Sequence, residues 1–382
     1  MKSYLVEGRY ISAENFTPSH LPVKYYGKID WKQKVKNYTP RKEFKLFRRI
    51  PDSLKNLIKL LDSFTHLDKI LSLSQNIGII AAGKLEMERD EIALKAHENP
   101  RQITPSDGFI FTHNGINFLV ANYLGIRFYK GLGIDHVCSS GNDIMGIADK
   151  LIKDGIIDTA LLIAINSMAC PSRTGYHKTL GVVSKSGKIM PFDEKRDGTV
   201  FADALAVAVI TGEKILEKLD TRFRLSIEGY EMVCDSYHMF SLDEKGTSFF
   251  TLTEALLNKT GAPKESVELV KAHATGTKLN DAAESRAYNK IFGANIQVTA
   301  LKPVIGHTVT ASGLIESIIL MESLKEGILP KTANHEKLGS DCAKIKVLTT
   351  GVPYRGGLIL SVSAGFGGFF SAILLKGAEN GG

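Results

Sequence analysis

The chain has 382 residues, a net charge of +7 and four cysteines: Cys138, Cys170, Cys234 and Cys342. Hydrophobic residues make up 43% and charged residues 23%, which is typical of a globular protein large enough to bury its own core. The cysteines form no C-x-x-C pair and have no histidine at zinc-ligand spacing. We therefore expect no disulfide framework and no metal site, but a reactive thiol in a reducing compartment.

The first residues, MKSYLVEGRY, lack the apolar stretch of a signal peptide, and no segment approaches the ~18 apolar residues of a membrane span. We expect a cytoplasmic protein with no membrane insertion. The mild positive charge favours an acidic or phosphorylated partner. At this point nucleic acid and an acidic carrier protein are both candidates.

The first half of the chain alternates between helical and strand-like patterns. Residues 20–50 are rich in Lys, Arg and Tyr, and we expect a surface connection there. An apolar stripe over 54–61 predicts a helix. Further along, we expect a strand over 76–83, helices over 115–130 and 138–155, and strands over 159–167, 205–212 and 225–233.

The second half continues the alternation. We expect a strand over 267–276 that runs into a loop, helices over 281–293 and 312–327, and a hairpin of 358–368 with 369–376. Alternating apolar strands and helices indicate an α/β fold with buried sheets.

Cys138 lies at the start of the helix predicted over 138–155. The first turn of a helix has free N–H groups and the positive end of the dipole, which favour a thiolate and hence a nucleophile. Ser139, Ser140 and Gly141 are small, so a thioester can approach closely. A buried cysteine that merely begins a helix is the alternative interpretation.

Two histidines lie in loops of the kind that form sites in α/β proteins. His273 follows the strand predicted from residue 267, and His307 lies in a glycine-flanked turn before the helix predicted from residue 312. Loops at the carboxyl ends of strands gather at one edge of a sheet. Each histidine alone could be a core residue, and only their combination with Cys138 indicates catalysis.

Four segments carry specific motifs: CSSG at 138–141, HATGTKLNDAAE at 273–284, KPVIGHTVTASG at 302–313 and GFGG at 365–368. In this order they resemble the β-ketoacyl synthases of the elongating type, in the thiolase superfamily. PFDEKRDG at 191–198 and DSYHM at 235–239 are weaker echoes. The initiating synthases have Asn where His307 stands, and thiolases use a second cysteine near the C-terminus.

The resemblance implies a thiolase-like duplicated fold of α-β-α-β-α layers. The N-terminal half, 1–240, would carry the nucleophile, and the C-terminal half, 241–382, both histidines. It also implies an acyltransferase. An acyl group on Cys138 would condense with a decarboxylating malonyl group on an acyl carrier protein, in fatty acid, polyene or polyketide synthesis. His273 and His307 would stabilise the enolate.

The family also implies roles for backbone groups and hydroxyls near the cysteine. The N–H groups of Cys138 and Phe366 would form an oxyanion hole, and Phe366, flanked by Gly365 and Gly367, would gate the acyl pocket. Thr275 and Thr277 would bind the pantetheine amides. His238 would lie near the mouth of the site. No metal is implied, and no cofactor other than the phosphopantetheine of the carrier protein.

Charged residues are expected both beneath the site and around it. Lys302 and Glu284 would form a buried ion pair with Asp281 beside it, although an exposed charged helix face is the alternative. The expected carrier-protein surface is basic and consists of Lys42, Lys45, Arg48, Arg49, Arg127 and Lys130. Solvated charge is the alternative there, and nucleic acid is disfavoured because no binding motif accompanies the charge.

Three departures from the family pattern keep other functions open. Residues 1–40 look shortened, Ala274 replaces the usual Gly, and Ala202-Asp203-Ala204 replaces the usual Gly-Glu-Gly. A homodimer is expected. The alternatives are a ketosynthase-like subunit of a heterodimer that has little activity alone, and an acyltransferase that does not condense.

Overall fold

The computed structural model describes residues 2–14, 17–18, 23–221 and 223–379. Within these ranges, eleven strands form one continuous hydrogen-bonded sheet. They are β1 (Ser3–Ser12), β4 (Ile77–Leu85), β5 (Lys130–Ile134), β6 (Thr159–Ser167), β7 (Ala204–Gly212), β8 (Phe223–Cys234), β9 (Val267–Lys271), β10 (Gln297–Thr299), β12 (Lys346–Val347), β14 (Leu358–Gly365) and β15 (Phe369–Glu379). The short strands β2 (Thr17–Pro18) and β3 (Tyr25–Tyr26) form one small pair, and β11 (Ile328–Leu329) and β13 (Val352–Pro353) form another.

The order of the strands contains an internal repeat. β1, β7, β6, β4 and β5 are neighbours in that order, joined by two antiparallel and then two parallel pairings. β8, β15, β14, β9 and β10 repeat the same pattern of pairings. β8 opens the second set, so this repeat begins before the predicted boundary at residue 240. The division into two domains at that residue stays a prediction.

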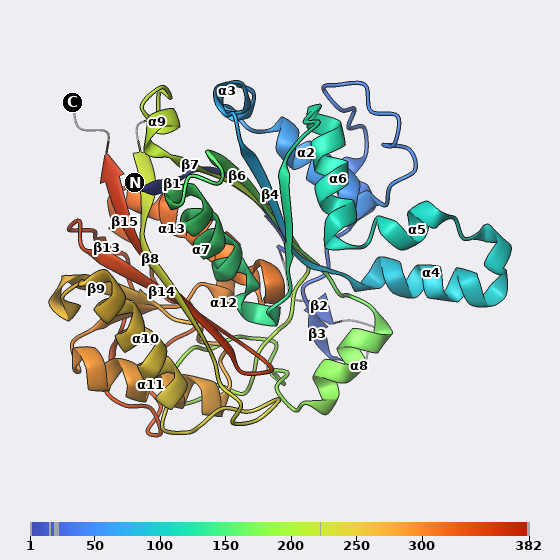
Figure 1. The fold of residues 1–382 in the computed structure, drawn as a ribbon. Coiled ribbons are helices and arrows are strands. Elements are labelled where there is room, and N and C mark those ends of the chain that lie inside the picture. The colour runs from blue at the N-terminus through green and yellow to red at the C-terminus, as the bar shows by residue number, and fades with distance from the viewer. Residues whose placement is uncertain (1, 15–16, 19–22, 222, 380–382) are drawn as a thin grey trace.

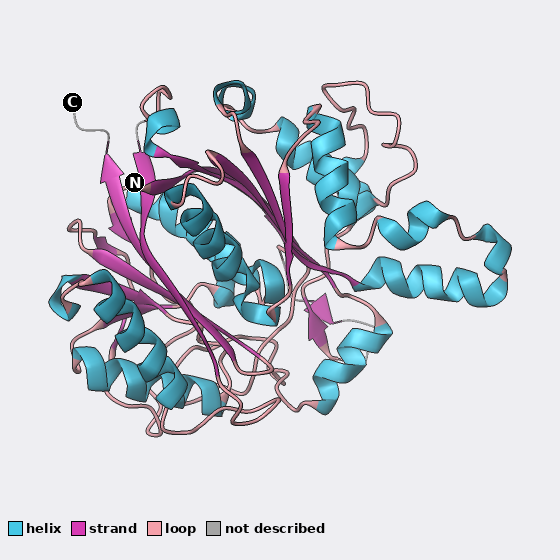
Figure 2. Ribbon diagram, viewed as in Figure 1, coloured by secondary structure: helices cyan, strands magenta, loops and turns pink. Residues whose placement is uncertain are grey.

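The helices cover both faces of the sheet (Figures 1 and 2). They are α1 (Trp31–Val35), α2 (Asp52–Asp62), α3 (Leu67–Leu73), α4 (Glu86–Glu98), α5 (Pro105–Phe109), α6 (His113–Leu124), α7 (Ser140–Lys153), α8 (Pro171–Thr179), α9 (Glu213–Leu216), α10 (Thr247–Thr260), α11 (Lys278–Phe292), α12 (Lys302–Ile305) and α13 (Ser312–Lys325). None within the described ranges is both long and apolar enough to cross a membrane.

The helices and the two halves of the sheet form five layers, as the α-β-α-β-α prediction requires, with apolar cores packed between them. α2 and α6 pack on the outer face of one half of the sheet, and α10 and α11 pack on the outer face of the other. α7 and α13 lie between the two halves (Figure 1). Burial on both sides explains why strands such as β6 are apolar along their whole length.

The two central helices begin in the same way. A 3₁₀ turn precedes each, over Val137–Ser139 and over Val309–Ala311. The first residue of each turn has a positive φ, 52° at Val137 and 47° at Val309. The helices cross where a Cβ on Gly141 would lie 2.6 Å from the backbone nitrogen of Leu314. The glycine of the CSSG motif therefore permits the contact that brings the cysteine turn beside the loop of His307.

Most predicted elements of the central sheet and its helices are confirmed, with shifted ends. The helix predicted over 115–130 is wrong at its end, because Gly125 takes a left-handed conformation (φ 74°) that terminates α6. The segment 20–50, predicted as a connection, contains β3 and α1, and its residues 20–22 lie outside the described ranges. β1, α4, α8 and α10 were not predicted.

Candidate active site

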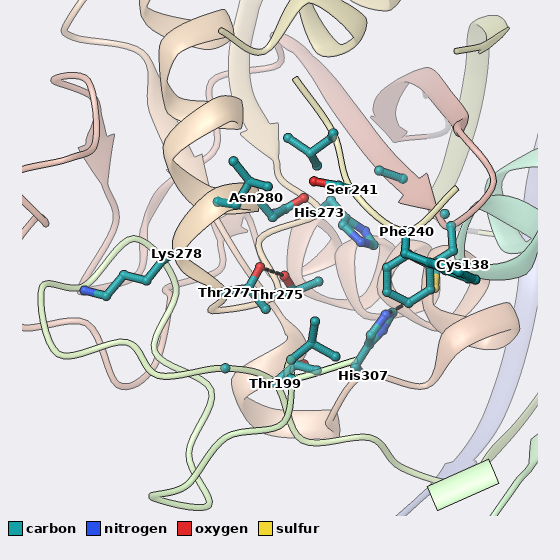
Figure 3. A pocket seen from close by; sticks show the side chains of 18 of the residues that line it. Cys138, Thr199, Phe240, Ser241, His273, Thr275, Thr277, Lys278, Asn280 and His307 are labelled. Atoms are coloured by element: carbon teal, nitrogen blue, oxygen red, sulfur yellow. Dashed lines mark hydrogen bonds between the residues drawn. The ribbon is translucent and has the colours of Figure 1, made fainter. Parts of the chain in front are cut away.

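A cavity of about 540 Å³ lies where the loops after β9, β10 and β14 meet. Cys138, His273, His307, Gly365 and Phe366 line it. Figure 3 shows the cysteine and the two histidines gathered toward one end, with Lys278 at the other. The structure therefore brings together all three predicted catalytic side chains.

Cys138 lies in the 3₁₀ turn immediately before α7, and 5% of its surface is exposed. Its Sγ is 3.2 Å from Nε2 of His307. The other cysteines do not line the cavity. Burial raises the pKa of the Cys170 thiol, and raises that of Cys342 to about 11. Cys138 is thus the cysteine placed to act as a nucleophile.

His307 is held on three sides. Its backbone N–H donates to the carbonyl of Val200, its Nδ1 lies 3.3 Å from the Ser312 hydroxyl, and its ring stacks on Phe201 at 5.4 Å. Burial, and then the positive charge of Lys302, hold its pKa well below the ordinary value. The ring is therefore neutral. Its Nε2 points at the Cys138 sulfur.

His273 faces His307, with ring centroids 5.5 Å apart and planes at 83°. Burial and the charge of Lys302 also hold its pKa well below the ordinary value. Among the described residues, its buried Nδ1 has no hydrogen-bond partner. Two neutral imidazoles therefore line the cavity with Cys138, and the one on His307 contacts its sulfur.

Glu284 supports the His273 loop through the backbone. Its carboxylate accepts from the N–H of His273 at 2.8 Å and from that of Ala274 at 2.6 Å. Ala274 has φ 40°, in the left-handed region that favours glycine, so Glu284 holds a strained residue in place. Tyr288 and Asn280 also donate to the same carboxylate.

The predicted ion pair of Lys302 with Glu284 is wrong. Lys302 Nζ donates instead to Glu316 of α13 at 2.8 Å, and Lys271 donates to the other oxygen of the same carboxylate. All three side chains are fully buried. Glu284 already accepts from the His273 loop and from its own helix α11, so Glu316 is the carboxylate left between the two ammonium groups beneath the histidines.

Asp281 is buried beside Glu284, as predicted, and Asn280 donates to both carboxylates. The Asp281 carboxylate also accepts from the backbone N–H of Phe192 at 2.7 Å, and Nε of Arg196 lies 3.9 Å from it. Burial raises its pKa to about 7. Asp281 therefore connects the loop after β9 to the segment that carries Arg196.

The glycine turn after β14 packs directly against the cysteine turn. A Cβ on Gly365 would lie 2.8 Å from the carbonyl oxygen of His136 and 3.1 Å from the nitrogen of Cys138. The ring of Phe366 meets Phe240 edge to face at 6.0 Å. Gly367, with φ 84°, completes the turn. The predicted donors of the oxyanion hole, the N–H groups of Cys138 and Phe366, thus belong to two turns in contact.

Toward the mouth of the cavity, Thr275 and Thr277 line the wall, with their hydroxyls 3.0 Å apart. His238 does not line it. None of the six basic residues predicted to bind a carrier protein lines the cavity either: Lys42, Lys45, Arg48, Arg49, Arg127 and Lys130. All six are exposed, so their role stays a prediction.

Aromatic residues of the site escaped the sequence analysis. Phe201 stacks on His177 at 3.7 Å as well as on His307, and Phe240 lines the cavity. His177 is buried, and that burial lowers its pKa to about 4. The signal lay in the two weaker motifs, because Phe240 follows directly after 235–239 and Phe201 comes three residues after 191–198.

The cysteine and two histidines gathered in one cavity match the motif pattern of the β-ketoacyl synthases. A family model of the β-ketoacyl synthase N-terminal domain matches residues 65–214, and one of the C-terminal domain matches residues 225–336. The chain belongs to the β-ketoacyl synthase family.

The chain spans only part of the length of the curated relatives that it matches. The chain is 31% identical over 248 residues to a putative polyketide β-ketoacyl synthase 1 of Streptomyces cyaneus, covering 63% of this chain and 59% of that protein. It is 26% identical over 288 residues to the 3-oxoacyl-[acyl-carrier-protein] synthase 2 of Coxiella burnetii, covering 72% and 69%.

Solved structures share the whole fold at low identity. A chain of AntDE:AntF, a type II polyketide synthase acyl carrier protein in complex with its ketosynthase, has a TM-score of 0.83 at 20% identity over 98% of both chains. A chain of the ketosynthase ApeO in complex with its chain length factor ApeC, from Xenorhabdus doucetiae, has a TM-score of 0.81 at 19% identity, covering 99% and 98%.

Proposed function

We propose that this chain is a condensing enzyme that joins an acyl group held on Cys138 to a malonyl unit carried by an acyl carrier protein. One observation carries the proposal: the Cys138 sulfur lies 3.2 Å from Nε2 of His307, and the neutral ring of His273 faces that of His307 inside the same cavity. A thiol and two imidazole donors are the groups that acyl transfer and enolate stabilisation need.

In the first stage, the thiolate of Cys138 attacks the carbonyl carbon of an acyl thioester. A new C–S bond forms, the bond between the carbonyl carbon and the pantetheine sulfur breaks, and pantetheine leaves as a thiolate. The negative charge on the carbonyl oxygen is met by the N–H groups of Cys138 and Phe366. A donor fixed in this way typically contributes about 2.7–4 kcal/mol to lowering the barrier.

In the second stage, a malonyl thioester loses CO₂, and the electron pair of the broken C–C bond forms an enolate. His273 and His307 donate N–H groups to the enolate oxygen. Each ring must therefore carry a proton on the nitrogen that faces this oxygen. The enolate carbon then attacks the acyl carbonyl on Cys138. The sulfur leaves as thiolate, and the product is a β-ketoacyl thioester.

The partners of the reaction follow from the same proposal. Substrates would arrive on the phosphopantetheine of an acyl carrier protein, with Thr275 and Thr277 toward the mouth of the cavity. The enzyme would need no metal and no cofactor of its own, and it would work in the cytoplasm as a homodimer or with a ketosynthase-like partner. Fatty acid, polyene and polyketide synthesis all use this chemistry.

The test is turnover of the purified chain with acyl and malonyl carrier-protein thioesters, followed by mass spectrometry of the carrier-bound product. The proposal predicts a β-ketoacyl product from the chain alone. A chain that makes product only after a ketosynthase-like partner is added is the heterodimer subunit. A chain that loads acyl groups but never condenses them is an acyltransferase of another kind.

A further inference from the structure

His136 lies two residues before Cys138, and both of its backbone polar groups fold the cysteine turn. Its carbonyl accepts from the N–H of Ser139 at 3.1 Å and from the Ser139 hydroxyl at 2.9 Å. Its N–H donates to the Ser140 hydroxyl at 2.9 Å. Between them Val137 is held at φ 52°, a conformation that a β-branched residue adopts only under constraint.

The side chain of His136 is anchored from below. Its Nδ1 is 2.8 Å from Asp143, which is 1% exposed and lies in the first turn of α7. The same carboxylate accepts from the hydroxyls of Ser139 at 2.8 Å and Tyr230 at 2.9 Å. Because two side chains of the cysteine turn and one of β8 meet on this buried carboxylate, the imidazole has little freedom to rotate.

The other face of the imidazole stacks on Phe369, with centroids 4.7 Å apart and planes at 6°. Phe369 begins β15, and its cross-strand partner is Gly365, the last residue of β14. The His136 carbonyl is also the atom that a Cβ on Gly365 would meet at 2.8 Å. His136 thus contacts both strand ends that flank Phe366.

We infer that His136 is a positioning residue that fixes the spacing between the N–H groups of Cys138 and Phe366. This inference rests on the proposed function, because it concerns the oxyanion hole of the acyl-transfer step. The ring joins the cysteine turn to the glycine turn, and Asp143 fixes the ring. A displacement of a reacting group by about 1 Å can lower a rate roughly 100-fold, so a spacer of this kind acts on rate without touching the substrate.

The experiment compares two reactions of the same sulfur. Acylation by a thioester passes through an oxyanion, whereas alkylation by iodoacetamide does not. In His136→Leu, the leucine can neither donate to Asp143 nor stack on Phe369, and we expect acylation of Cys138 to slow about 10- to 100-fold, with alkylation within about twofold of wild type. A general loss of folding would lower both rates together.

Three further variants keep the test decisive. His136→Asn can still donate to Asp143 and should recover much of the acylation rate. Phe369→Leu removes the stacked ring and should slow acylation selectively. His97→Asn, at an exposed position on α4, should behave as wild type.

The outcomes separate this inference from the proposed function. If wild type loads acyl groups and His136→Leu loads them equally fast, the inference is wrong and the function stands. If acylation and alkylation fall together in His136→Leu and in Phe369→Leu, the two residues support the turn only structurally. If wild type accepts no acyl thioester while His136→Leu alters nothing, both proposals fail.

Discussion

The buried charges beneath the catalytic histidines and the basic residues at 42–49 differ in how their charges are paired. Beneath the histidines, Lys271, Lys302 and Glu316 are completely buried, and each ammonium reaches the one carboxylate. On the surface, Lys42 lies 3.5 Å from Asp68 with both side chains at least half exposed. Buried charge fixes geometry and is costly to disturb, whereas solvated charge is screened and tolerant of change.

The largest effect on activity is expected from His273 and His307. His273→Ala and His307→Ala each remove a donor to the enolate, so condensation should fall about 10²- to 10⁴-fold, and acyl loading much less. Loading and condensation are measured separately by mass spectrometry of the protein and of the carrier product. A variant that condenses at the wild-type rate shows that its histidine is structural.

Removing the buried carboxylate of Glu316 should lower the stability of the fold as well as the activity. Glu316→Gln leaves two buried ammonium groups without a counter-charge, which should reduce the free energy of unfolding by about 3–5 kcal/mol. Glu322→Gln, on the same helix but exposed, breaks only a 3.9 Å surface pair and should change it by less than about 1 kcal/mol. Equal losses in urea unfolding would contradict the distinction between buried and surface charge.

Because His177 is buried, the protein should lose stability at acidic pH. Burial lowers its pKa from 6.5 to about 4, so between these values the unfolded chain binds the extra proton. Stability should therefore fall as pH drops from 6.5 toward 4. His177→Phe keeps a ring against Phe201 without a titrating group and should lose up to about 3 kcal/mol less over this range. Parallel unfolding curves for the two proteins would refute the assignment.

The smallest effect per residue is expected from the exposed basic residues at 42–49, and it should appear in the KM for a carrier-bound substrate. Replacing Lys45, Arg48 and Arg49 by Glu should raise the apparent KM for a carrier-bound substrate, with each lost pair contributing about 0–1 kcal/mol, and added salt should mask the difference. Activity on a small pantetheine thioester is the control and should stay near wild type. If both substrates suffer equally, the segment supports the fold and the carrier surface lies elsewhere.

That Cys138, His273 and Phe366 lie together could be predicted because each lies in a motif that also sets local structure. Gly141, Gly365 and the loop after β9 place Cys138, Phe366 and His273 by backbone geometry that the sequence displays. The partner of Lys302 could not be predicted from the motif, since Glu284 and Glu316 are both candidates until the fold is known. Glu316 within the apolar run of α13 was the available signal.

The elements missed by sequence reasoning are those whose burial depends on distant neighbours. β1 carries charged and polar residues, yet it pairs with β7 and β8 at the centre of the sheet. α4 is polar along most of its length and gives no apolar stripe to recognise. His136 gave no sequence signal, because its partners Asp143 and Phe369 come from two elements far apart in the sequence.

The central claim is that Cys138 carries the acyl group, and peptide mapping after incubation with acyl carrier-protein thioesters tests it most directly. The account predicts one acyl adduct, on the peptide that contains Cys138, and none in Cys138→Ser under conditions that preserve thioesters. An adduct on Cys170, Cys234 or Cys342, or a Cys138→Ser protein that still forms the thioester, would contradict it.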